Sequence, residues 1–430
     1  MTKYNIIISR ILLAYIWGSY IIYLILPIQP VDLGRNEIYS FIFLVFISIA
    51  IYYGCKSIPI PRSQTLVDND SLLLGVRITT ILLLLVIVVG ILYERDFLTT
   101  LGIATITANM GENYELMLEM DTEFNMTSRI GQIYTLISPI RYFLLVYCCY
   151  YYSKIGKINK YLFLVLVALA LFHSVFVTGT QKGVGDVVIL LLVAIAIKEL
   201  KKNRIKRIIK IAGISLSVFL VFFTLSQITR SEALGNDAGL SSNAYYSYDE
   251  NNIVCKLLGK NVGEGVIRFG LYFSNGYPGL NYCLQMPFEW TNGYGGSRAA
   301  DDYLHRYLGL PSKFKRTYPL RMEDTVGWPG LLYWPSAYAW WASDLSFPGV
   351  VVFMFFLARF LCVLFKEAYC KGNPLSIVLL SYFSIMVVYL PANNQLLQSS
   401  ANFISTVVLF ITWVLFHKKY NNPIKYSVTK

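Results

Sequence analysis

Long apolar stretches recur along most of this chain, and short polar segments separate them. A helix needs about 20 mostly apolar residues to cross the hydrocarbon core of a bilayer. By this criterion we expect an all-α polytopic membrane protein with about ten transmembrane helices. The predicted spans are Ile6–Leu26, Ile38–Gly54, Leu72–Tyr93, Gln132–Tyr152, Tyr161–Thr178, Val184–Leu200, Ile208–Ile228, Phe347–Phe365, Pro374–Leu390 and Ala401–Phe416.

One long polar insert interrupts this pattern and divides the chain into three parts. Residues 1–228 form an N-terminal bundle of about seven spans, residues 229–346 form a large loop, and residues 347–430 hold about three spans and a tail. Within the loop, apolar residues at helical spacing over Ile253–Phe273 predict a helix that lies on the membrane surface. The segment Trp328–Trp341 is rich in Trp and Tyr, which indicates an interfacial or re-entrant segment.

The charges of the short loops alternate between the two sides of the predicted bundle. Lysines and arginines follow the second, fourth, sixth, eighth and tenth spans, whereas loop Glu94–Gly131 is acidic and loop Pro391–Gln398 is uncharged. Positive loops stay in the cytoplasm, so both termini are predicted to be cytoplasmic. The large insert is then extracytoplasmic.

Composition agrees with a membrane protein. Mean hydropathy is +0.52 and only 14% of residues are charged, against about a quarter in soluble domains. The net charge of +12 is explained by the basic loops, and no zinc-finger or RNA-recognition spacing indicates nucleic-acid binding. Cys255 and Cys283 both fall in the insert, where they either pair or remain free thiols. No cluster of metal ligands is visible, and we expect no metal or other cofactor.

A glycine-rich turn, Thr178–Gly185, joins the fifth and sixth spans on the outer side. Its glycines permit close approach of a ligand, and the following helix N-terminus attracts anions. Gln181 and Lys182 are therefore candidates for binding a phosphate group. The alternative is a tight turn with a solvated lysine.

Arg141 lies inside the fourth predicted span. An arginine at this depth is costly and usually faces a cavity or a partner. It either adds to an anion site or holds helices together through an internal ion pair.

The densest group of charged candidates lies in the insert, between residues 298 and 324. Arg298, Arg316 and Arg321 have the guanidinium geometry that suits a pyrophosphate, and contact with lipid headgroups is the alternative. His305, Glu323 and Asp324 are candidates for accepting a proton from a sugar hydroxyl. The acidic pair either does this or only pairs with Arg321. Nearby tryptophans either stack on sugars or form an aromatic belt.

Three features together resemble the O-antigen polymerase family of oligosaccharide repeat-unit polymerases. These are the layout of many spans with one large outer loop, the sequence TGTQKG at 178–183, and the stretch from LPSKFKRTYP at 310–319 to SDLSFPG at 343–349. The chain departs from the family at Gln181, where arginine is common. Lys182 or Arg141 would then supply the positive charge that this arginine provides in the family.

The resemblance implies a C-type membrane glycosyltransferase in the bacterial inner membrane. Such an enzyme joins repeat units carried on undecaprenyl pyrophosphate at the outer leaflet, in O-antigen or capsule-like polysaccharide and lipopolysaccharide biosynthesis. Its expected partners are these lipid-linked oligosaccharides, membrane lipids and a chain-length regulator protein. It implies pyrophosphate binding by Arg141, Gln181, Lys182, Arg298, Arg316 and Arg321, with His305, Glu323 or Asp324 as the catalytic base.

Two rival functions share parts of this pattern. An O-antigen ligase uses the same lipid donor and has a similar layout, but transfers the polysaccharide to lipid A-core. A flippase moves lipid-linked oligosaccharides across the membrane. Transporters of this kind commonly show repeated halves, and the sequence shows no internal repeat.

Overall fold

The computed structural model describes residues 3–31, 36–58, 74–101, 123–177, 180–233, 240 and 242–421, and it is almost entirely helical there. In this part of the chain, eight helices are long and apolar enough to cross a membrane. They are α1 (Lys3–Ile25), α2 (Ile38–Lys56), α3 (Val76–Leu101), α6 (Arg129–Tyr150), α7 (Lys157–Phe172, extended by the π-helical turn η2, His173–Val177), α9 (Ile205–Ala233), α15 (Ser336–Lys366, extended by the π-helical turn η4, Glu367–Lys371) and α18 (Ser400–Asn421).

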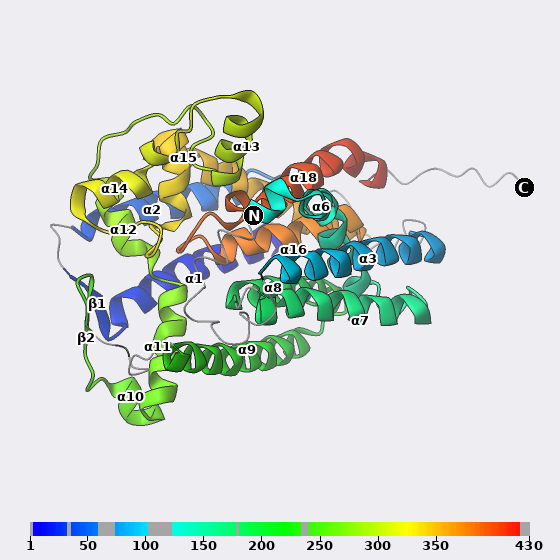
Figure 1. Ribbon diagram of the computed structural model, residues 1–430, viewed down its shortest axis with the longest axis horizontal. Helices are drawn as coiled ribbons and strands as arrows, with labels where there is room; N and C mark the ends of the chain where they lie inside the picture. Colours follow the sequence, from blue (N-terminus) through cyan, green and yellow to red (C-terminus); the bar gives the residue numbers. More distant parts are fainter. Residues whose placement is uncertain are drawn as a thin grey trace, which may run out of the picture.

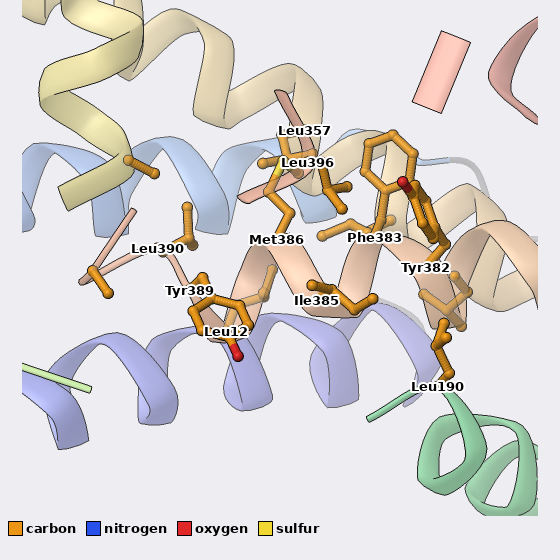
Figure 2. Packing of buried hydrophobic residues seen from close by; sticks show 14 of the residues in the cluster. Leu12, Leu190, Leu357, Tyr382, Phe383, Ile385, Met386, Tyr389, Leu390 and Leu396 are labelled. Atoms are coloured by element: carbon orange, nitrogen blue, oxygen red, sulfur yellow. The ribbon is translucent and has the colours of Figure 1, made fainter. Parts of the chain in front are cut away.

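Two more helices coincide with predicted spans, α8 (Gln181–Lys201) and α16 (Pro374–Val388). At about 1.5 Å per residue, the 15 residues of α16 fall short of a bilayer about 30 Å thick. Buried side chains from α1, α8, α15 and the short α17 (Gln395–Gln398) surround α16, as Figure 2 shows for Leu12, Leu190, Leu357 and Leu396. An all-α membrane architecture is thus confirmed, while the number of about ten crossings stays a prediction.

The insert folds into short elements at one end of the bundle (Figure 1). They are β2 (Tyr246–Tyr248), α10 (Ile253–Leu258), α11 (Lys260–Tyr272), α12 (Gly276–Leu284), α13 (Arg298–Leu308), the 3₁₀ turn η3 (Phe314–Arg316) and α14 (Tyr318–Val326). Tyr277 of α12 and Trp328 belong to the same hydrophobic core as the spans. The insert is therefore packed onto the bundle.

Contacts between loops show which helix ends share a side. Strand β1 (Ile28–Pro30), after α1, pairs antiparallel with β2 of the insert, with Ile28 opposite Tyr248. At the other end of the bundle, the Tyr151 hydroxyl donates to the carbonyl of Gly372 at 3.2 Å, and Arg359 donates to Ser57 Oγ at 2.6 Å. These groupings agree with the predicted alternation of sides. Which side is the cytoplasm stays a prediction.

The tryptophan-rich segment differs from its predicted form. Helix α15 begins at Ser336 and runs through Trp340 and Trp341 into the eighth span, with a break at Ser346 (φ 62°, ψ 163°). Trp328, Trp340 and Trp341 are buried within the protein. These three rings fill protein core and are closed to sugars, and the interfacial or re-entrant placement of the segment stays a prediction.

The predicted surface helix over Ile253–Phe273 is two helices. Gly259, with φ +78°, separates α10 from α11. This positive φ is one that residues with a side chain rarely adopt, so the glycine sets the position of the turn. The result is a hairpin in place of one continuous amphipathic helix.

Candidate functional site

A cavity of about 350 Å³ lies at the insert end of the bundle. Helices α9 and α11 and the paired strands β1 and β2 contribute to its wall. The lining residues are Ile28, Phe223, Gln227, Leu240, Asn243, Tyr246, Arg268, Leu271, Tyr272, Asn275 and Tyr333.

The polar part of this wall suits a hydroxylated, anionic ligand. It offers one guanidinium, three amides and three phenols, groups that bind sugar hydroxyls and phosphate oxygens. Burial lowers the pKa of Arg268, while the carboxylate of Glu264 raises it. A partly desolvated cation of this kind binds an anion more strongly than a fully hydrated one does.

Close packing between α9 and α11 places Arg268 at the cavity. A Cβ added to Gly265 would lie 2.4 Å from Thr224 Cγ2, so the glycine lets α11 press against α9. The ring of Phe223 meets that of Phe269 edge to face, with centroids 5.4 Å apart. Arg268 follows Gly265 by three residues, about one helical turn.

The rim of the cavity is fixed by side-chain hydrogen bonds. Asn243 donates to the Tyr333 hydroxyl at 3.3 Å and accepts from the backbone of Tyr246 at 2.8 Å. The Tyr246 hydroxyl in turn donates to Asn275. The polar groups are thus held in place before a ligand arrives.

The cavity connects to the predicted phosphate turn through one hydrogen bond. Gln227 of the wall donates to Gln181 Oε1 at 3.0 Å, at the start of α8. Gln181 is only 4% exposed, and its Nε2 is buried without a partner. Lys182 lies 3.9 Å from Asp186, one turn further along α8. Thr178 and Gly179 of the turn lie outside the described residues.

Arg141 lies near the same part of the bundle, because α6 packs against α8. Its guanidinium stands over the rings of Tyr134 at 4.4 Å and Tyr142 at 5.2 Å. The hydroxyl of Tyr142 donates to Asn402 at 2.7 Å. Arg141 and Lys182 thus lie on neighbouring helices, and of the predicted anion-binding residues Gln181 is the one that contacts the cavity wall.

Two of the predicted insert arginines are engaged by a single carboxylate. Arg321 donates to Glu289 at 2.6 Å and to the carbonyl of Pro287 at 2.8 Å, and it covers the Tyr318 ring at 5.0 Å. Its side chain is only 13% exposed, whereas that of Arg316, 3.5 Å from the same Glu289, is 50% exposed. Arg321 is thus packed into the insert, and its predicted role in pyrophosphate binding stays a prediction.

Arg298 lies in a separate aromatic environment on α13. Its guanidinium stands 5.7 Å from the centre of the Phe314 ring, which stacks on Trp340. Burial raises the pKa of the neighbouring Asp302, while Arg298 lowers it.

The three predicted bases are exposed. His305 Nδ1 lies 2.8 Å from the carbonyl of Leu310, and Glu323 and Asp324 face outward on α14. None of the three lines the cavity. Their catalytic role stays a prediction, and the geometry of the cavity lends it no support.

Cys255 and Cys283 are both free thiols, so they do not form a disulfide with each other. Cys283 is buried against the Met322 sulfur at 3.8 Å, and Cys255 lies 3.4 Å from the Tyr248 hydroxyl. Within the described ranges, no group of three or more His, Cys, Asp or Glu side chains is placed to hold a metal ion.

Arg268 lines the cavity but is not among the candidates taken from the sequence. It stands among the polar residues of a predicted amphipathic helix, where a surface cation is expected. Two local signals point to it: Glu264 four residues earlier, a spacing that pairs charges on one helix face, and Gly265, which marks a close helix contact.

Comparison with known proteins identifies no relative. The chain matches no family model, no curated protein and no solved structure.

Proposed function

We propose that this protein is a membrane glycosyltransferase that polymerises lipid pyrophosphate-linked oligosaccharide repeat units. The observation that carries the proposal is the position of the cavity. Its wall includes Phe223 and Gln227 of α9, a helix whose apolar stretch is only 11% buried within the protein and so faces lipid. A carrier lipid alongside α9 would bring its polar headgroup to the amides, phenols and Arg268.

The chemistry requires stabilisation of a pyrophosphate leaving group. The acceptor hydroxyl attacks the anomeric carbon, the bond from that carbon to the pyrophosphate oxygen breaks, and the hydroxyl proton is released. Arg268 would stabilise the negative charge that grows on the pyrophosphate as the bond breaks. Lys182, beyond the Gln181–Gln227 hydrogen bond, would add a second positive charge nearby.

The remaining wall groups would position the sugars. Tyr246, Tyr272 and Tyr333 present hydroxyls that donate and accept, and the neighbouring asparagines do the same. Groups of this kind can exchange hydrogen bonds with the hydroxyls of a sugar. The bacterial inner membrane, with the cavity facing away from the cytoplasm, is the location that this function requires.

Purified protein incubated with lipid-linked repeat units alone tests the proposal. A ladder of product lengths is expected for wild type, and its loss is expected for Arg268→Ala. Wild-type ladders from Arg268→Ala would refute the assigned site. A product that forms only when lipid A-core is supplied would identify a ligase.

A deletion strain separates polymerase from flippase. Labelled lipid-linked substrate should accumulate in the outer leaflet when a polymerase is missing. Accumulation in the inner leaflet would identify a flippase and overturn the proposal.

A further inference from the structure

The α10–α11 hairpin exposes an apolar surface that no described part of the chain covers. Ile253 is 71% exposed and Leu257 is 77% exposed, and Leu258 and Val262 are each at least half exposed. Isolated exposed leucines are normal, but a contiguous group on one element marks an interaction surface.

The hairpin is closely packed and hydrogen-bonded at its base. A Cβ on Gly263 would lie 2.7 Å from the Cα of Cys255, which shows how closely α10 folds back onto α11. Asn252 caps α10 by accepting from the backbone of Cys255 at 2.9 Å, and its amide donates to the Tyr248 hydroxyl at 3.1 Å. The start of α10 is thus anchored to β2.

The hairpin lies at the edge of the bundle, beside lipid-facing α9. Figure 1 shows α11 running across the direction of the spans at the insert end of α9, with α10 projecting past α9. Gly265 of α11 contacts Thr224 of α9, near the end of the apolar stretch of α9. The α10 helix is therefore joined to α9 through α11, which packs against both.

Two lysines accompany this apolar surface. Lys256 and Lys260 are exposed on the same hairpin. Exposed apolar side chains next to lysines are typical of helices that lie in a membrane interface, where anionic lipid headgroups attract the cations.

We propose that α10 and the start of α11 dock on the bilayer surface on the insert side. Ile253, Leu257, Leu258 and Val262 enter the boundary between headgroups and acyl chains, and Lys256 and Lys260 contact headgroup phosphates. The hairpin thereby holds the bilayer surface next to the cavity, because α11 packs against α9 and both helices line the cavity. This docking does not depend on the reaction proposed above.

Site-directed fluorescence in vesicles tests the docking. Leu257→Cys carries a small thiol-reactive fluorophore, and Asp324→Cys on exposed α14 is the water-facing control. Wild-type protein measures background labelling, because Cys149 and Cys255 are only half-buried while the other five cysteines are buried. Each labelled protein is reconstituted with phosphatidylglycerol-containing vesicles whose acyl chains carry a shallow quencher.

The label at 257 should be quenched by the lipid-borne quencher at least roughly twofold more strongly than the label at 324, and less by aqueous iodide. Equal access of iodide to both labels would overturn the docking. Protection of the 257 label from both quenchers would indicate coverage by a second copy of the chain, and would overturn it as well. Neither result bears on the polymerase assay, so the two proposals fail separately.

Discussion

The two arginine-bearing regions of the insert differ in what their cations contact. On α14, Arg321 is taken up by Glu289, the carbonyl of Pro287 and the ring of Tyr318. On α11, Arg268 faces a cavity of about 350 Å³ with amides and phenols around it. The region with the higher density of charge contributes no residue to the cavity wall, whereas a single arginine of an amphipathic helix does.

This difference has a physical cause. Arg321 would have to break its hydrogen bonds to Glu289 and Pro287 before it could bind a substrate. Arg268 lines the cavity, where burial lowers its pKa and the carboxylate of Glu264 raises it.

The largest effect is expected from Arg268→Ala, which should lower polymerisation about 100-fold or more by removing stabilisation of the leaving group. The in vitro ladder assay measures it, and Arg268→Lys should recover only part of the activity because a point charge lacks the guanidinium fork. Arg316→Ala is the matched control and should keep near-normal activity. A larger loss of activity in Arg316→Ala than in Arg268→Ala would contradict the assignment of Arg268 to the site.

Arg321→Ala should lower the free energy of unfolding by about 2–3 kcal/mol, because two charge-assisted hydrogen bonds and a ring contact are lost. Thermal unfolding in detergent measures the change. Exposed ion pairs contribute about 0–1 kcal/mol, so the half-exposed Arg316→Ala should shift the transition little. An Arg321→Ala protein with normal stability and no activity would instead support a direct role in substrate binding.

Gly265→Ala should cost about 1–2 kcal/mol and displace Arg268, because the new methyl group meets Thr224. Activity and thermal unfolding should fall together, and Thr224→Ala in the same chain should restore part of both. Gly213→Ala on α9, where an added Cβ meets nothing within 4 Å, is the control and should be neutral. No rescue by Thr224→Ala would contradict the packing argument.

The smallest effect is expected at Asp302, whose pKa burial raises. The folded state then holds its proton at pH values where the unfolded state has released it. Stability should fall as pH rises from the ordinary Asp pKa through the raised one. Asp302→Asn should remove this slope and raise the melting temperature slightly at neutral pH. A steeper slope in the variant would show that Arg298 outweighs burial.

Several features could be predicted from the sequence because they depend on local pattern. Apolar runs place the long helices within a few residues, since a bilayer demands about 20 apolar residues wherever the chain crosses. The eighth predicted span, beginning at Phe347, follows directly after the break at Ser346. The alternation of basic loops agrees with the contacts that put β1 beside β2.

The candidate site depended on contacts between distant segments. Gln181 was singled out from its turn, but its link to the cavity runs through Gln227 on another helix. An aromatic belt was one prediction for the tryptophans, yet Trp328 and Trp340 are core residues. Composition alone does not show whether an aromatic side chain is surrounded by lipid or by protein.

By itself, the sequence determined that this is a helical membrane protein with a large polar insert, because hydrophobic length and loop charge are properties of consecutive residues. Only the tertiary structure decided which arginine packs against Glu289 and which one lines a cavity. Arg321 and Glu289 are 32 residues apart, and Arg268 and Gln227 line one cavity from different helices. Such contacts depend on how the helices pack, and helix packing cannot be deduced from any single stretch of the sequence.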